Sequence, residues 1–115
     1  MRIEPDFIRK LLLKIDSWES FNPVTNKDLA DNDTPINKVN IYLDFLMEEE
    51  LINAKKTEYI GGTKLYQIRY LTLKGQKFVD IIKPPTIWEK HKETIISAGI
   101  SSLSEIISMI INHLN

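Results

Sequence analysis

The order of helix signals and turn signals over residues 24–75 restricts the fold of this chain more than any other feature of its sequence. Thr25 suits the N-cap of a helix over residues 25–31, because its hydroxyl oxygen can accept a hydrogen bond from a free backbone N–H of the first turn. Pro35 suits the first residue of a second helix, over residues 35–50, since that position leaves the backbone N–H unused. Two helices this close together predict a helix-turn-helix unit.

Two strand-like segments follow this unit, over residues 51–59 and 64–71. Gly61-Gly62 between them supplies the positive φ angles that a tight hairpin requires. The alternation of the second segment places Tyr66, Ile68 and Tyr70 on one face and Gln67 and Arg69 on the other. A helix-turn-helix unit followed by a two-stranded hairpin is the pattern of a winged helix, in which the hairpin is the wing.

The rest of the chain is predicted to be helical. Residues 5–18 carry apolar side chains at helical spacing and end on Trp18, which we expect to pack in the core together with Trp88. Two further helices are predicted over residues 73–83 and 86–97, separated by a pair of prolines that stops the first of them.

The predicted fold class is mainly α with a small β-hairpin: a winged helix-turn-helix domain over residues 1–83 and a C-terminal extension of two helices over residues 84–115. The last helix carries an apolar stripe within an arc of about 100°, made by Leu103, Ile106, Ile107, Ile110 and Leu114. Such a stripe either packs back onto the first helix and the wing or forms a symmetric interface. We expect a homodimer through this stripe.

Composition argues against several classes of function. The 115 residues include no cysteine and two histidines, so we expect no disulfide, no metal site and no cofactor. No apolar run reaches the roughly 18–20 residues that span a bilayer, which predicts a cytoplasmic protein without a membrane partner. The side chains of Glu48-Glu49-Glu50 point about 100° apart on a helix and do not converge on a substrate, so we expect no enzyme activity.

Charge is distributed unevenly along the chain. Residues 22–50 carry two lysines against seven acidic residues, a net charge of −5, whereas residues 51–75 carry five basic residues against one glutamate, a net charge of +4. The predicted wing is therefore basic, while the second helix of the helix-turn-helix unit is acidic. Because neutralisation of phosphates supplies much of the affinity for duplex DNA, the sequence offers half of the basic surface that such binding requires.

Seven residues are candidates for contact with DNA. Four face outward from the predicted helix over residues 35–50: Asn37, Lys38, Asn40 and Ile41. Asparagine can bond an adenine edge twice, and lysine can reach guanine or phosphate. The wing adds three lysines, Lys55, Lys56 and Lys64, although lysines on edge strands also serve to prevent aggregation. The alternative for the helix face is a solvated polar surface without a partner, since Asp44 and Glu48 project from it and would repel phosphates.

Four short motifs occur in a characteristic order: Pro5-Asp6 with Ile8-Arg9-Lys10-Leu11-Leu12-Leu13, Leu71-Thr72 with Gly75 and Phe78, Ile87-Trp88-Glu89-Lys90, and Gly99 with Ser101-Ser102-Leu103. Their order and spacing over essentially the whole chain resemble the domain-of-unknown-function family 2513. The resemblance implies a winged-helix protein of a kind commonly encoded by phages and prophages of low-GC Gram-positive bacteria. The family has no established activity or catalytic residues that could be carried onto these positions. Family members often carry a glycine where the helix over residues 35–50 meets the wing, whereas this chain has Glu48-Glu49-Glu50.

The function that these patterns predict is that of a DNA-binding transcriptional regulator, with double-stranded DNA as its partner. The alternative is a winged-helix adaptor or inhibitor that binds a host or phage protein through the acidic helix and an exposed Ile41 and Tyr42. Charge separates the two hypotheses. DNA binding requires Lys55, Lys56 and Lys64 to form one continuous positive surface with the start of that helix.

Overall fold

The computed structural model describes residues 2–98, which form five α-helices and a three-stranded antiparallel sheet. In chain order the elements are α1 (Pro5–Asp16), β1 (Val24–Thr25), α2 (Asn26–Leu29), α3 (Ile36–Glu48), β2 (Ile52–Glu58), β3 (Lys64–Leu71), α4 (Leu73–Ile82) and α5 (Pro85–Ala98). The predicted mainly α fold with a small β-hairpin is confirmed. The stripe assigned to a homodimer, within residues 103–114, lies outside the described residues.

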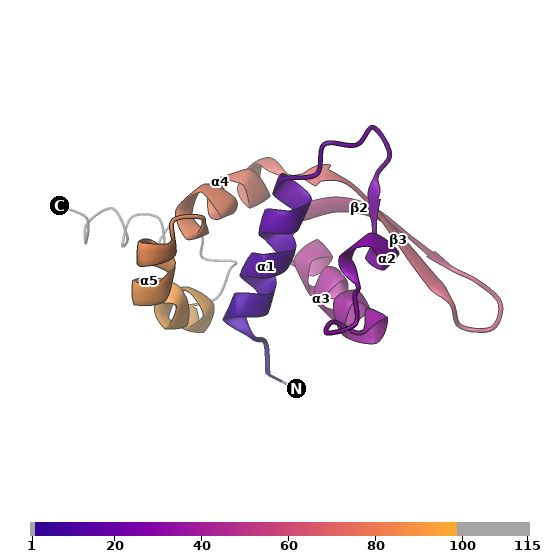
Figure 1. Cartoon of the computed structure of the whole chain (residues 1–115), viewed down its shortest axis with the longest axis horizontal. Helices are drawn as coiled ribbons and strands as arrows, with labels where there is room; N and C mark the ends of the chain where they lie inside the picture. The colour runs from indigo at the N-terminus through magenta and orange to yellow at the C-terminus, as the bar shows by residue number, and fades with distance from the viewer. Residues whose placement is uncertain (1, 99–115) are drawn as a thin grey trace.

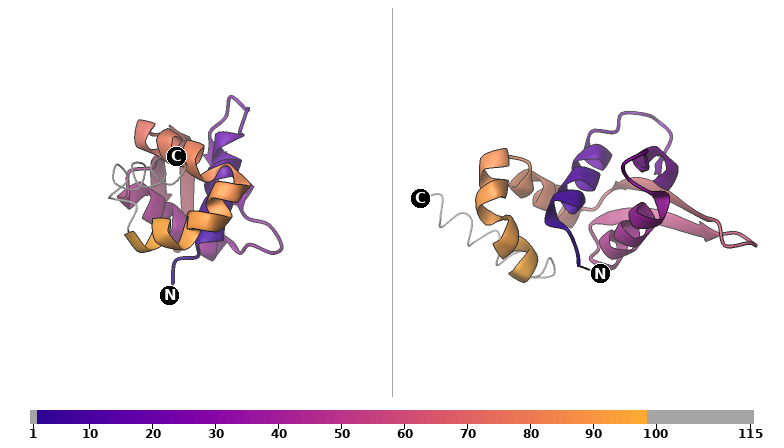
Figure 2. Two further views of the ribbon diagram at one scale, coloured as in Figure 1. Left: turned by 90° about the vertical axis from the view of Figure 1, so that its left-hand side faces the viewer. Right: turned by 60° about the horizontal axis from the view of Figure 1, so that its bottom comes forward.

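α1 lies between α5 and α3, and the β2–β3 hairpin extends past the helices at the end of the molecule opposite α5 (Figure 1; Figure 2). All five helices contribute side chains to one core, and α5 contributes the buried apolar side chains of Trp88 and Ile95. The indole N–H of Trp88 donates to Asp6 in the first turn of α1 over 2.7 Å, and this hydrogen bond lowers the pKa of Asp6. The predicted burial of Trp88 is confirmed. Within residues 2–98, no helix is both long and apolar enough to cross a bilayer.

The end of α1 differs from the prediction. The helix stops at Asp16, and Trp18 lies beyond it in the connection to β1. The side chain of Trp18 is 37% exposed, and its indole N–H donates to the carbonyl oxygen of Asn22 over 3.0 Å. The prediction that Trp18 packs in the core is therefore wrong, because the helical turn that would have directed it inward does not form.

β1 is a strand that the sequence pattern did not predict. Val24 pairs with Ile68 and Thr25 with Gln67, so β1 lies along the edge of β3 that β2 leaves open. A strand of two residues has no periodicity of its own. It forms because a partner about 40 positions later in the chain presents an open edge.

The long pair of strands contains a bulge. Asn53 of β2 faces Tyr70 of β3, but the next residue, Ala54, faces Ile68, so Arg69 is an extra residue on β3. Such an insertion reverses the alternation of side chains between the two faces of the strand. Tyr70 is exposed as a result, whereas Tyr66 and Ile68 are buried, so the prediction that the three share one face is wrong.

Threonine caps begin α2 and α4, as predicted for Thr25. The Thr25 hydroxyl accepts from the N–H of Asp28 over 3.3 Å, and the Asp28 carboxylate accepts from the N–H of Thr25 over 2.8 Å. The Thr72 hydroxyl accepts from the N–H of Gly75 over 3.0 Å and donates to the carbonyl oxygen of Glu50 over 2.6 Å. Thr72 therefore fixes the start of α4 to the end of α3.

α3 ends in a Schellman motif. The N–H of Leu51 donates to the carbonyl oxygen of Leu46 and the N–H of Glu50 to that of Met47, each over 3.0 Å. The motif needs a left-handed residue directly after the C-cap, which is Glu49, and Glu50 has a φ of 60°. Glycine adopts this conformation more readily than any other residue. Glu50 therefore stands at the junction where the family resemblance leads one to expect glycine.

Replacing Glu50 by glycine is expected to raise the free energy of unfolding by about 0.5–1 kcal/mol, because glycine takes a positive φ without a clash at Cβ. Glu49→Gly is the matched control: Glu49 has a φ of −81°, so glycine there should lower stability. Denaturation with urea measures both changes. Equal effects of the two substitutions would show that the conformation of Glu50 is not strained.

Candidate nucleic-acid interface

The outward side of α3 is mostly polar and acidic. Asn37, Ile41 and Glu48 are exposed and Asp44 is half-buried, at spacings that place them along one side of the helix. Ile41 is 47% exposed. Tyr42 is buried, and its hydroxyl accepts from the N–H of Glu4 over 2.8 Å, so the expectation of an exposed Tyr42 is wrong.

Two of the four candidates on α3 are bound within the protein. The ammonium group of Lys38 lies 2.7 Å from the carboxylate of Glu4 and 4.6 Å from the centre of the Phe7 ring. The hydrogen bond to Glu4 raises the pKa of Lys38. Asn40 accepts a hydrogen bond from the amide of Asn26 over 2.8 Å. The structure therefore leaves Asn37 and Ile41 as the candidates on α3 whose side chains are exposed.

Lys56 belongs to a polar cluster between α3 and the hairpin. Its ammonium group lies 3.1 Å from the Asp44 carboxylate, which also accepts a hydrogen bond from the Tyr66 hydroxyl over 2.7 Å. Burial and the hydrogen bond to Asp44 raise the pKa of Tyr66 to about 12, and hydrogen bonds to Asp44 and Tyr66 raise the pKa of Lys56. Lys56 remains charged near neutral pH, but two nearby carboxylates, of Asp44 and Glu58, offset its charge.

The remaining lysines lie on opposite faces of the hairpin. Lys56 pairs with Tyr66, whose side chain is buried beneath α3, and Lys64 lies on that same face at a spacing of two residues. Lys55 pairs with Gln67 and points to the other face. Lys55 and Lys64 are both exposed. The continuous positive surface that we required of Lys55, Lys56, Lys64 and the start of α3 is therefore not formed.

The residues that join the hairpin to the helices by hydrogen bonds were not predicted from the sequence. Asn26 is fully buried and bonds to Asn40 and to the backbone of β3, and Asp44 bonds to Lys56 and Tyr66. These partners lie 12 to 40 positions apart in the chain. The periodicity of a single segment carries no signal for such contacts.

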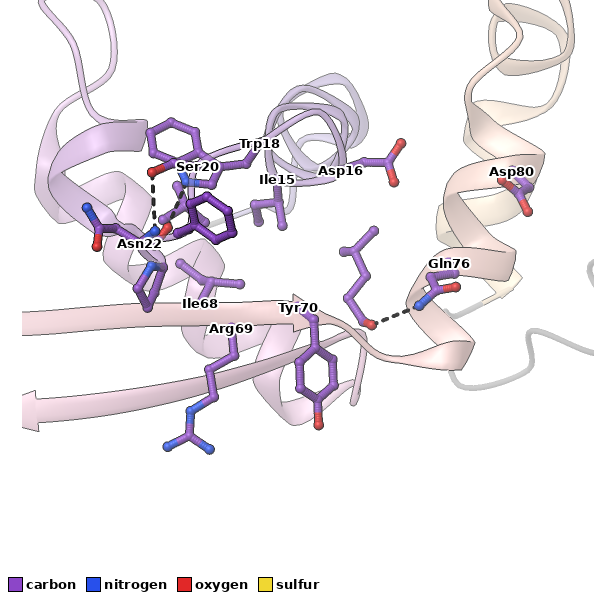
Figure 3. A pocket seen from close by; sticks show the side chains of 14 residues that line it. Ile15, Asp16, Trp18, Ser20, Asn22, Ile68, Arg69, Tyr70, Gln76 and Asp80 are labelled. Atoms are coloured by element: carbon purple, nitrogen blue, oxygen red, sulfur yellow. Dashed lines mark hydrogen bonds between the residues drawn. The ribbon is translucent and has the colours of Figure 1, made fainter.

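A hollow of about 550 Å³ lies between the end of β3 and the connection from α1 to β1. Figure 3 shows Ile15 and Ser20 on one side of the strand and Arg69 and Tyr70 extending from the other. The carboxylate of Asp16 lies 3.9 Å from the ammonium group of Lys83. Among residues 2–98, no group of three or more His, Cys, Asp or Glu side chains is placed to hold a metal ion.

The described residues thus form a small, mainly α protein with a protruding antiparallel hairpin and a partly acidic helix beside it. A family model with the description hypothetical protein (DUF2513) matches residues 2–101, and the chain belongs to this family. No curated protein and no solved structure matches the chain.

Proposed function

We propose that the chain is a non-enzymatic winged-helix protein that binds duplex DNA through its β2–β3 hairpin and regulates transcription. The order α1, β1, α2, α3, β2, β3 supports the winged-helix assignment. The observation that carries DNA binding is the charge of the hairpin. Residues 52–71 hold four basic residues against one glutamate, a net charge of +3, on an element that extends past the helices (Figure 1).

Because Lys55, Lys56, Lys64 and the start of α3 do not form one positive surface, the contacts proposed here differ from those that the sequence predicts: the hairpin makes most of them, and α3 makes few. α3 carries Lys38 against Asp44 and Glu48, and Glu4 already pairs with Lys38. A net negative helix laid deep in the major groove would repel phosphates. Contact with bases is then confined to the first half of α3, where Asn37 and Ile41 are exposed without a charge.

The double substitution Lys55→Glu and Lys64→Glu is expected to weaken binding to duplex DNA at least tenfold and to reduce the slope of log K against log salt by about two, one for each lost phosphate contact. Lys56 is left in place because it holds Asp44 and Tyr66. Lys77→Glu with Lys90→Glu makes the same change in net charge on α4 and α5, and both lysines are exposed. A gel-shift titration at low salt measures all three proteins. The proposal fails if the wild type does not bind at micromolar concentration, or if the two double variants bind equally.

The exposed side of α3 favours a second candidate function, a winged-helix adaptor or inhibitor of another protein. Ile41 is a partly exposed apolar residue beside Asp44 and Glu48, a combination that fits a partner with an apolar pocket rimmed by basic residues. A photo-crosslinking residue at position 41 should then capture one protein in host cells. The same residue at position 77, on α4, is the control. Capture at both positions, or at neither, would contradict this function.

A further inference from the structure

The tip of the hairpin exposes two apolar side chains. Ile60 is fully exposed and Tyr59 is about half-exposed. Both belong to the turn beyond the last paired residues of β2 and β3, and the hairpin reaches past the helices (Figure 1; Figure 2). A scattered exposed apolar residue is ordinary on a protein surface. Two adjacent ones at the outermost point of a basic element call for a physical explanation.

The turn holds Ile60 outward in a defined conformation. The N–H of Gly62 donates to the carbonyl oxygen of Tyr59 over 3.1 Å, and the N–H of Tyr59 donates to that of Thr63 over 2.8 Å. Gly61 and Gly62 have φ angles of 100° and 93°, as predicted for a tight hairpin. Two backbone hydrogen bonds therefore close the turn directly around Ile60. An apolar group held in this way enters a partner without first losing the freedom of a mobile loop.

Charge on the two faces of the hairpin indicates which partner the tip meets. Lys55 lies on one face and Lys64 on the other, with the apolar tip beyond both. A flat surface could contact one of these lysines at a time. A groove with a phosphate strand on each side contacts both when the hairpin enters tip first, which is the arrangement of the DNA minor groove.

We propose that the hairpin tip is a wedge. Ile60, with the adjacent Tyr59, enters the minor groove, partly unstacks one base step and bends the duplex. This proposal rests on the proposed function, because it specifies how the hairpin binds DNA. A minor groove about 6 Å wide does not admit a hairpin with its side chains unless it opens. Insertion of an apolar side chain between base pairs opens it and bends the DNA away from the protein. A tip of this kind bends pyrimidine–purine steps such as TA more easily than a stiff A-tract.

The test measures DNA shape separately from affinity. A short duplex with one central TA step carries fluorophores at its two ends and 2-aminopurine at the step, and each protein is added to saturation. The wild type is expected to bend the duplex by about 20–90°, seen as increased energy transfer between the ends, and to raise 2-aminopurine fluorescence by unstacking it. Ile60→Ser should bind with a dissociation constant within about tenfold of the wild type, yet at least halve the bend and abolish the rise in fluorescence.

The matched control is Leu73→Ser, which replaces another largely exposed apolar residue, at the start of α4. It should bind and bend as the wild type does. Because Ile60 and Leu73 are both exposed, neither variant is expected to unfold, and circular dichroism checks this. A wild type that binds without bending, or an Ile60→Ser variant that bends fully, overturns the wedge while leaving DNA binding in place.

Three other outcomes also test the proposal. If the wild type binds no duplex at low salt, the proposed function and the wedge proposal are both wrong. If it binds no duplex but binds vesicles of anionic lipid through Ile60, the tip is a membrane contact and the wedge is overturned. A wild-type affinity that is equal for the TA duplex and for an A-tract duplex of the same length would likewise contradict bending at a flexible step.

Discussion

Gly75→Ala is expected to lower the free energy of unfolding by about 3 kcal/mol or more, although alanine favours a helix over glycine by about 1 kcal/mol. Gly75 lies in the first turn of α4, close to the backbone of Leu51, the residue before β2. A Cβ at this position would collide with the carbonyl oxygen of Leu51. That oxygen cannot move aside freely, because it accepts the N–H of Thr72 over 3.0 Å. Both backbone segments must shift, and the core beneath them must repack.

Thermal and urea denaturation measure this effect, which should appear as a fall in the melting temperature of roughly 10 °C or more. Lys77→Ala is the control, since Lys77 is exposed in the same helix and should change stability by about 0.5 kcal/mol or less. If Gly75→Ala were as stable as Lys77→Ala, α4 would not approach Leu51 as closely as the structure shows.

Local chemistry was enough to predict most of the elements. The apolar stripe of α1, the threonine that caps α2 and the glycines of the hairpin each act within a few residues, so the sequence carries their signal directly. Two predictions from local periodicity were wrong, each because of one local irregularity of the backbone. One inserted residue, Arg69, turned Tyr70 outward, and the early end of α1 left Trp18 exposed.

The candidate site was harder to predict, because its residues have partners from distant segments. The place of Lys38 on α3 predicts a contact with DNA, and in the fold the ammonium group of Lys38 also contacts Glu4 and Phe7. The charge of Lys56 predicts another, and in the fold Asp44 offsets that charge. Adjacent lysines in a strand also point to opposite faces, so a basic stretch of sequence is not a basic surface. The close contact at Gly75 likewise leaves no trace in the pattern of α4 itself.

Asn26 shows most clearly how distant partners define the fold, and Asn26→Asp is expected to make stability depend steeply on pH. The side chain is fully buried. Its amide donates to Asn40 over 2.8 Å and to the carbonyl oxygen of Lys64 over 3.0 Å, and its oxygen accepts the N–H of Tyr66 over 3.2 Å. Aspartate has nearly the same shape but no amide donors. Its ionised form would place a buried charge against two acceptor oxygens.

Burial and these two oxygens would raise the pKa of the introduced carboxyl in the folded protein above its unfolded value of about 3.9. The folded state then binds more protons than the unfolded state, so the free energy of unfolding falls as pH rises, by about 1.4 kcal/mol per pH unit until the folded pKa is reached. Below about pH 4 the carboxyl is neutral in both states, and the variant should lose only about 1–2 kcal/mol, for one missing donor.

Urea denaturation from pH 4 to pH 8, with the wild type subtracted at each pH, measures this dependence. At pH 7 the variant is expected to be less stable than the wild type by about 3–5 kcal/mol, or to be unfolded, because an uncompensated charge is then buried. Asn37→Asp is the control: Asn37 is exposed near the start of α3, where a negative charge is tolerated and solvent shields it. The stability difference between Asn26→Asp and the wild type could instead stay constant across this range, or equal that of Asn37→Asp. Either result would mean that Asn26 is not buried in the hydrogen bonds that join α2 to α3 and β3.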